Sequence, residues 1–147
     1  MTSAMPVSSV LPDPATPFGA RVARRLREEM VIWLTAVAAD GTPQPNPVWF
    51  LWDGTSFLIY CRREAKRLEH TQRNPHVALH FNSDGQGEDI VVFTGTARIA
   101  TGEPPADQNP QYLEKYRDGI AELVGTFQEF AAHSVPVRVT PERVRGY

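Results

Sequence analysis

The chain has 147 residues, with 15 basic and 17 acidic side chains and a pI near 6.1. This length fits one domain with a sizeable core. The near-neutral charge argues against nucleic acid as a partner, because phosphate-backbone binding needs a basic face. The single cysteine, Cys61, excludes an intrachain disulfide. Since no secretory signal and no apolar run of about 20 residues is evident, we expect no membrane partner and a cytoplasmic location.

The first 17 residues are rich in proline, serine, threonine and alanine and predict a flexible tail before one domain over residues 18–147. A helix is predicted over residues 18–29, where Phe18, Val22 and Leu26 recur at helical spacing. The apolar residues 30–39 then predict a strand, which Asp40-Gly41 ends with a tight hairpin turn.

The next predicted strand, residues 44–52, is interrupted by prolines at positions 43, 45 and 47. Proline cannot donate a hydrogen bond to a β-ladder, so this strand is expected at a sheet edge, a bulge or a gap that faces a ligand. Such a gap would leave backbone groups free for a ligand at Asn46, Val48 and Trp49.

A second hairpin turn, Asp53-Gly54, leads into a predicted strand over residues 55–61. A basic helix follows over residues 64–73 and stops at Asn74-Pro75. This helix would place Lys66 one turn inside its start.

The rest of the chain predicts strands over residues 76–81, 90–100 and 135–139, and helices over residues 111–117 and 120–131. The last helix carries an apolar stripe at helical spacing: Ile120, Leu123, Val124, Phe127 and Phe130. Gly95 inside the second of these strands predicts a bulge or a close backbone approach. Residues 143–147 are expected to trail the last strand. Six mainly antiparallel strands with short helices predict an α+β domain built on a barrel.

Two features have both a functional and a structural interpretation. The basic segment after residue 61 either binds a phosphate, with Lys66 near a helix start, or is a solvated helix face. The aromatic residues of the two hairpins either wall a slot for a flat cofactor or fill the barrel core.

Other chemistries find little support in the sequence. His76 and His80 would lie about 13 Å apart along one strand, so no metal site is expected. Arg62 and Arg63 could activate Cys61 as a nucleophile, but no His–Asp partner is identifiable, and a structural cysteine is the alternative. The patterns of α/β-hydrolases, Rossmann folds and P-loops are missing.

Four segments together resemble the pyridoxamine 5′-phosphate oxidase-like split β-barrel family, in particular its actinobacterial branch of F420-dependent oxidoreductases. They are WLTAVAADGTPQPNPVWFLWDG, FLIYCRREAKRLEHTQRNPHVALHF, DIVVFTGTARIA and the terminal VRVTPERVRGY. The resemblance covers residues 30–100 and the last dozen, and it implies a split β-barrel that forms a homodimer with cofactor sites at the subunit interface.

The resemblance also implies the site residues. The strand Asn46, Pro47, Val48, Trp49 and Phe50 would lie along a flavin or deazaflavin ring, mostly through backbone groups. Tyr60 and Cys61 would end the neighbouring strand near the cofactor phosphate. Lys66 matches the family's phosphate-binding lysine. The phosphate or an acidic tail would be contacted by Arg62, Arg63 and Arg67. The cofactor would carry the hydride chemistry, so no catalytic side chain is named.

The implied function is reduction of a small conjugated organic substrate with coenzyme F420, and FMN is the alternative cofactor. F420 has a tail with several carboxylates that the arginines could meet. Two departures from the family pattern leave the cofactor open: Cys61 stands where a hydroxyl residue is common, and Tyr147 where the branch often has tryptophan. A non-catalytic binder of F420, FMN or a tetrapyrrole-like ligand and an FMN-dependent pyridoxamine-phosphate oxidase are the alternative functions.

Overall fold

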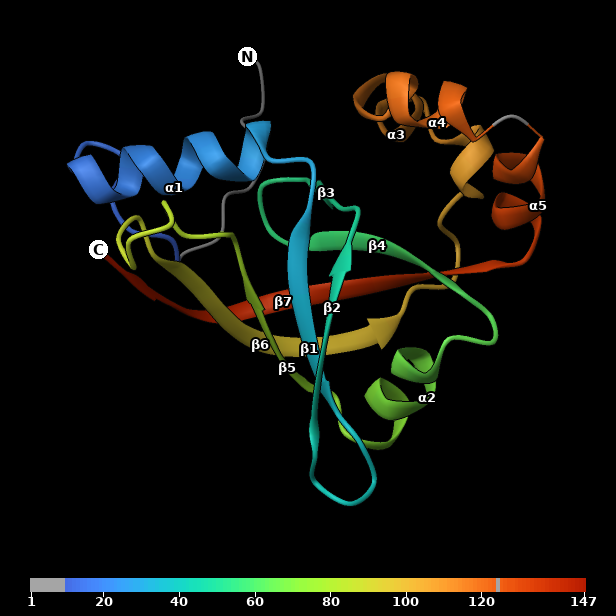
Figure 1. Cartoon of the computed structure of the whole chain (residues 1–147), viewed down its shortest axis with the longest axis horizontal. Coiled ribbons are helices and arrows are strands. Elements are labelled where there is room, and N and C mark those ends of the chain that lie inside the picture. Colours follow the sequence, from blue (N-terminus) through green and yellow to red (C-terminus); the bar gives the residue numbers. More distant parts are fainter. Residues whose placement is uncertain (1–9, 124) are drawn as a thin grey trace, which may run out of the picture.

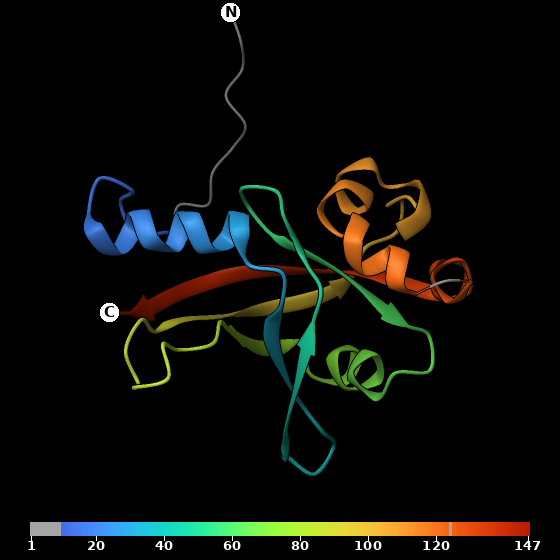
Figure 2. The ribbon, with the colours of Figure 1, turned by 45° about the horizontal axis from the view of Figure 1, so that its top comes forward.

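The computed structural model describes residues 10–123 and 125–147. Within this part, seven strands form one sheet of antiparallel pairs, in the order β2-β1-β5-β6-β7-β4-β3. The sheet is strongly curled, so the β1–β2 hairpin crosses the long strands β6 and β7 (Figures 1 and 2). The prediction of an α+β barrel with short flanking helices is confirmed.

The two predicted hairpins are confirmed. β1 (Ile32–Val37) pairs with β2 (Pro43–Val48), and β3 (Leu51–Trp52) pairs with β4 (Phe57–Arg62). Gly54 has φ near 100° in the second turn, a conformation that residues with a side chain rarely adopt. The predicted strand 44–52 is broken at residues 49 and 50, which is why the sheet has seven strands and not six.

The prolines place β2 at the sheet edge, as predicted. Since proline has no N–H, Pro43, Pro45 and Pro47 must occupy the positions of β2 that do not donate to β1. The backbone groups of Asn46 and Val48 therefore face Leu34 and Ile32 across the ladder. The expectation that the backbone of Asn46 and Val48 is free for a ligand is wrong, because the edge instead exposes proline carbonyls.

The second half of the sheet is longer than predicted. β5 (His76–His80), β6 (Val91–Ile99) and β7 (Ser134–Gly146) pair in sequence. β7 does not end at residue 139 with a trailing segment; it continues because its residues 143–146 pair with the start of β6. A bulge lies at Gly95, where a Cβ atom would overlap the Thr140 carbonyl oxygen, so glycine is required.

Among the described residues, the helices lie in three groups around the sheet. α1 (Pro17–Glu28) is capped by the Thr16 hydroxyl, which accepts a hydrogen bond from Gly19 N–H. α2 (Lys66–Arg73) follows β4, so Lys66 is the first helical residue and not one turn inside. The other helical segments gather beside β4 (Figure 1): η1 (Ala106–Gln108), α3 (Pro110–Lys115), α4 (Arg117–Glu122) and α5 (Thr126–Ala132).

The predicted helix over residues 120–131 is interrupted between α4 and α5, where Gly125 has φ near 79°. Val124, a member of the predicted apolar stripe, and residues 1–9 of the predicted tail lie outside the described residues. Leu11, also within the predicted tail, packs against the barrel core. In the described ranges no helix is long and apolar enough to cross a membrane.

Strand β4 separates two apolar clusters, because its side chains alternate between its two faces. Phe57, Ile59 and Cys61 point into the barrel core. Leu58 and Tyr60 point the other way and pack under the helices between residues 106 and 132. All five side chains are buried, so β4 is covered on both faces.

Two side chains at the C-terminal end of α3, Lys115 and Tyr116, bind the backbone at the strand break of residues 49 and 50. The Phe50 N–H donates to the Tyr116 hydroxyl at 2.8 Å, and the Phe50 carbonyl accepts from Lys115 Nζ at 2.7 Å. Tyr116 Oη also lies 3.0 Å from that carbonyl oxygen and 2.7 Å from the Met30 carbonyl oxygen. Backbone groups that β-pairing leaves free at Phe50 are thus satisfied by side chains.

Burial lowers the pKa of Lys115 to about 8, with the charge of Glu29 opposing the shift. Between pH 8 and pH 10.5 the unfolded lysine still binds its proton while the folded one has released it. The unfolded chain then binds more protons, so the free energy of unfolding should rise with pH. Because Lys115 is only partly buried and solvent screens part of the shift, we expect a gain on the order of 1–2 kcal/mol across that interval.

The matched variant is Lys115→Met, which removes the charge and leaves Tyr116 to bond the Phe50 carbonyl. Urea unfolding of both proteins from pH 7 to pH 10 measures the difference. The wild-type protein should gain stability relative to the variant above pH 8. Parallel pH profiles would contradict the lowered pKa.

Candidate functional site

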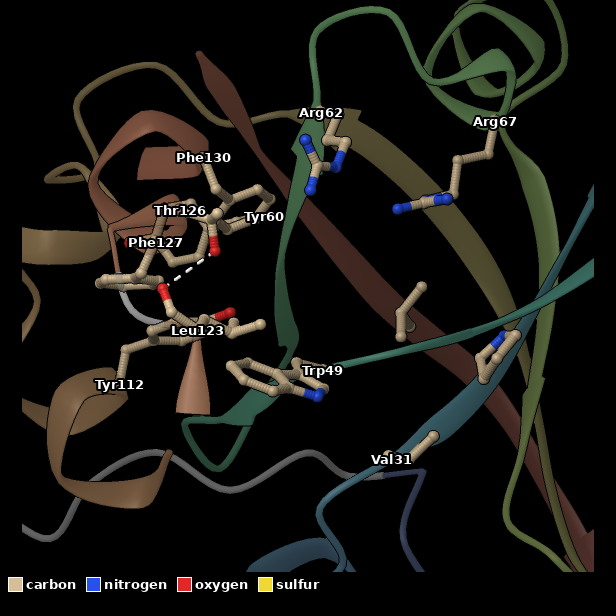
Figure 3. A pocket seen from close by; sticks show the side chains of 12 residues that line it. Val31, Trp49, Tyr60, Arg62, Arg67, Tyr112, Leu123, Thr126, Phe127 and Phe130 are labelled. Atoms are coloured by element: carbon tan, nitrogen blue, oxygen red, sulfur yellow. Dashed lines mark hydrogen bonds between the residues drawn. The ribbon is translucent and has the colours of Figure 1, made fainter. Parts of the chain in front are cut away.

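A pocket of about 370 Å³ opens beside the end of β4, within the size range of small-molecule sites. Its lining comes from the β2 end, β4, the start of α2 and the segment around α5 (Figure 3). Most lining residues are apolar or aromatic: Val31, Pro47, Val48, Trp49, Tyr60, Tyr112, Leu123, Phe127 and Phe130. Two are cations, Arg62 and Arg67. Thr126 adds a hydroxyl, which donates to the Leu123 carbonyl.

The aromatic wall is fixed by contacts behind it. The Trp49 ring stacks on Tyr116, with ring centroids 4.2 Å apart and parallel planes. The Tyr60 hydroxyl donates to the Pro104 carbonyl at 2.7 Å and accepts from the Asn109 amide at 3.1 Å. Burial also raises the pKa of Tyr60, so the phenol stays neutral at physiological pH. These rings therefore offer flat, preorganised apolar surface.

The cationic side of the pocket is not neutralised by protein carboxylates. Arg62 lies with its Cζ atom 5.5 Å from the Phe130 ring centroid. The Nε atom of Arg67 is buried and has no hydrogen-bond partner in the part of the chain that the structure describes. Among the described residues, neither guanidinium has an ion pair within 4.0 Å. Both point toward the same space in Figure 3, which suits an anionic group.

Six of the eleven residues predicted for the site line this pocket: Pro47, Val48, Trp49, Tyr60, Arg62 and Arg67. The other five do not. Phe50 and Cys61 lie in the barrel core with exposed fractions of 0% and 2%. Asn46 pairs with Leu34. Arg63 and Lys66 are exposed.

The separation of Tyr60 from Cys61 follows from strand alternation. Neighbouring residues of a strand point to opposite faces, so Tyr60 faces the pocket while Cys61 faces the core. Burial raises the pKa of the Cys61 thiol, and the positive charge of Arg67 opposes this more weakly. The structural interpretation of Cys61 is therefore favoured over the nucleophile.

Sequence reasoning missed the C-terminal half of the pocket wall. It recognised Leu123, Phe127 and Phe130 only as one apolar stripe of a helix and did not connect them to the site. The apolar stripe was the sequence feature that could have pointed to this wall. Only the fold shows that Phe130, a member of the stripe, lies against Arg62. Within the described residues, no cluster of three or more metal-ligating side chains occurs.

The family and structure comparisons agree with this fold. A family model described as Pyridoxamine 5′-phosphate oxidase matches residues 18–146. The comparison with curated proteins gave no match. Among solved structures, the chain is similar to an F420 reductase with a TM-score of 0.68 and 21% identity, covering 83% of this chain and 94% of the other.

Two further structures show the range of this fold. One is a Listeria innocua protein assigned as a pyridoxamine 5′-phosphate oxidase, with a TM-score of 0.62, 23% identity and coverage of 86% and 94% of the two chains. The other is a haem storage protein from Vibrio cholerae, with a TM-score of 0.62, 13% identity and coverage of 89% and 95%. At these identities the structures support the fold alone.

The buried Cys61 yields a direct test of the site geometry. We expect its thiol to react with a disulfide reagent at least about tenfold more slowly in the folded protein than in urea, because the thiolate is the reactive form. The chain has one cysteine, so the released chromophore reports this thiol alone. Equal rates in the two conditions would contradict its placement in the core.

Proposed function

The chain belongs to the pyridoxamine 5′-phosphate oxidase family, and we propose that it is an oxidoreductase that uses coenzyme F420 to reduce a small conjugated organic substrate. The single observation that carries this proposal is the convergence of Arg62 and Arg67 on an aromatic-walled pocket. A deazaflavin combines a flat ring with a phosphate and further carboxylates, and this pocket offers matching surfaces for each.

The residues present fit such a cofactor. The buried, unpartnered Nε of Arg67 calls for an acceptor, and a phosphate oxygen would supply it. The rings of Trp49, Tyr112 and Phe127 would hold the flat part of the cofactor and exclude water. When bound, the cofactor would supply the hydride transfer.

The protein's own task in this proposal is binding and orientation. Among the described residues, no side chain that lines the pocket is a carboxylate or an imidazole, so this lining offers no conventional general acid or base. Arg62 and Arg67 would neutralise the anionic group, and the fixed aromatic rings would orient the ring system. A substrate would then need to reach only the exposed face of the cofactor.

F420 is preferred over FMN because of charge. The pocket lining carries two cations and no carboxylate, and the exposed Arg63 adds a third cation beside Arg62. FMN ends at its phosphate and needs fewer cations, whereas the carboxylate tail of F420 would extend past the phosphate toward solvent.

We propose a homodimer as the functional form. Val31 and Leu123 line the pocket and keep exposed fractions of 38% and 42%. Apolar side chains at the rim of a binding site are typical of a surface that another chain covers. A second copy placed there would complete the site, as the family resemblance implies.

A non-catalytic binder is the second candidate. The Vibrio cholerae structure is described as a haem storage protein and shares this fold. The absence of an acid or base from the pocket lining agrees equally with storage. Turnover separates the two functions: an enzyme should oxidise reduced F420 when a quinone or enone acceptor is added, whereas a binder should not.

Oxidation of pyridoxamine phosphate is less well supported. It needs a second set of free cations for the substrate phosphate, for which Arg138, Arg143 and Arg145 are the candidates. Arg138 is already engaged, because it donates to Glu103 at 2.6 Å and to Asp53 at 3.1 Å. The remaining two arginines are exposed on β7 and do not line the described pocket.

The role of Arg67 is testable with a matched pair on one helix. Arg67→Gln should weaken binding of F420 and of FMN at least about tenfold, since a charge-assisted hydrogen bond is lost. Arg73→Gln should leave both affinities unchanged, because Arg73 is half-exposed and faces Glu69 at 3.5 Å. Titrations followed by tryptophan fluorescence measure both. Equal losses in the two variants would overturn the assignment of Arg67.

The carboxylate tail is tested by a second pair. Arg62→Ala should weaken F420 more than FMN, because it removes a pocket cation near the expected start of the tail. Arg63→Ala should have a smaller effect of the same kind, since this side chain does not line the pocket. The same fluorescence titration applies. Equal loss for F420 and FMN in Arg62→Ala would refute the tail argument.

A further inference from the structure

A second cavity of about 380 Å³ lies on the other side of the strand break, between α1, the β3–β4 hairpin and the end of α3. Its lining is mostly apolar and includes one amine: Leu11, Ala23, Leu26, Arg27, Leu51, Trp52, Gly54 and Lys115. It shares no lining residue with the pocket proposed for the cofactor. Its chemistry is therefore a separate question.

Lys115 is held in this cavity without an ion pair. Its Nζ atom lies 3.6 Å from the centroid of the Phe50 ring and donates one hydrogen bond, at 2.7 Å, to the Phe50 carbonyl. No carboxylate of the described residues lies within 4.0 Å of it. A lysine desolvated among apolar groups without a counter-ion is typical of amines that act as nucleophiles.

The hydrogen bond to Phe50 does not block this chemistry. A neutral amine has two N–H groups and a lone pair, so one N–H can remain on the carbonyl while the lone pair attacks. The imine nitrogen keeps no N–H, so this hydrogen bond is lost when water leaves. The Tyr116 hydroxyl lies 3.0 Å from the Phe50 carbonyl and 2.7 Å from the Met30 carbonyl, so its one proton can turn to Phe50 if Lys115 moves, at the expense of the bond to Met30. With its pKa lowered to about 8, about half of the amine is neutral at pH 8.

We propose that Lys115 forms an imine with a small apolar aldehyde that binds in this cavity. The nitrogen lone pair attacks the carbonyl carbon and the carbonyl oxygen takes up a proton, giving a carbinolamine. Loss of water then gives the imine. The overall reaction joins one amine and one aldehyde and releases one water, so it needs no oxidant or reductant.

The cavity wall selects the class of aldehyde. Leu26 is buried, and Leu11 and Trp52 pack against the core beside it, so the wall favours a short hydrocarbon chain. Arg27 is the one charged residue of the lining besides Lys115, and its side chain is 69% exposed. A hydrocarbon aldehyde such as propanal is therefore the simplest probe.

The sequence provides an internal control, because Lys66 and Lys115 are its only lysines. The full-length protein is treated with propanal and cyanoborohydride at pH 8, which traps the imine as a secondary amine. Peptide mapping by mass spectrometry then measures the labelling of each lysine, with the N-terminal amine on its own peptide. We expect Lys115 to be labelled at least about tenfold faster than Lys66, because Lys66 is exposed and lies outside the cavity that binds the aldehyde.

Labelling of Lys66 at the same rate as Lys115, or no labelling of Lys115, would overturn the proposal. In urea the two lysines should react at similar rates, since the cavity is lost. Ala23→Phe should slow the reaction of Lys115 and leave that of Lys66 unchanged, because it fills the cavity. Lys115→Arg keeps a cation without a reactive amine, so the label should disappear from that peptide. Unchanged labelling of Lys115 in a folded Ala23→Phe protein would also count against the proposal.

Discussion

The hydrogen bonds between Tyr116 and the backbone of Phe50 connect the two halves of this molecule. Prolines in β2 keep this strand at the edge of the sheet, because they cannot donate hydrogen bonds to a further strand. Residues 49 and 50 then separate β2 from β3. The Tyr116 hydroxyl satisfies Phe50 N–H at 2.8 Å and contacts the Met30 carbonyl at 2.7 Å. Because an unsatisfied buried backbone group costs about 1–3 kcal/mol, the helical segment is tied to the barrel at this point. Both cavities discussed above lie beside this junction.

The same junction sets the shape of the proposed cofactor pocket. Trp49 precedes Phe50 and stacks on Tyr116, so the residue that bonds the strand break also supports the pocket wall. Phe50 itself points into the core against Phe57 and Phe81. Of these two adjacent residues, Phe50 therefore packs in the core and Trp49 lines the pocket. The same alternation occurs in β4, where Cys61 lies in the core and Tyr60 lines the pocket. The site and the core are two faces of one set of strands.

Charge pairing distinguishes the arginines of the pocket from others in the chain. Arg25 is buried on α1 and bonds Glu29, Asp89 and the Asn82 carbonyl, which fixes the loop before β6. Arg138 is neutralised by Glu103 and Asp53. These side chains have structural partners, whereas Arg62 and Arg67 line an aromatic pocket without a carboxylate. Unpaired cations in a concave, partly buried place are the pattern expected of an anion site.

The sequence by itself determined the features that depend on local chemistry. The Asp-Gly turns fixed both hairpins because glycine tolerates positive φ. The prolines fixed the edge position of β2 because they cannot donate. Gly95 marked the bulge that Thr140 requires. Only the tertiary structure decided which side chains meet. It placed Phe127 and Phe130 beside Arg62, and Lys115 against Phe50, across some 65 residues of chain in each case. Such contacts depend on how the sheet curls and where the helices dock, and no spacing along the chain encodes them.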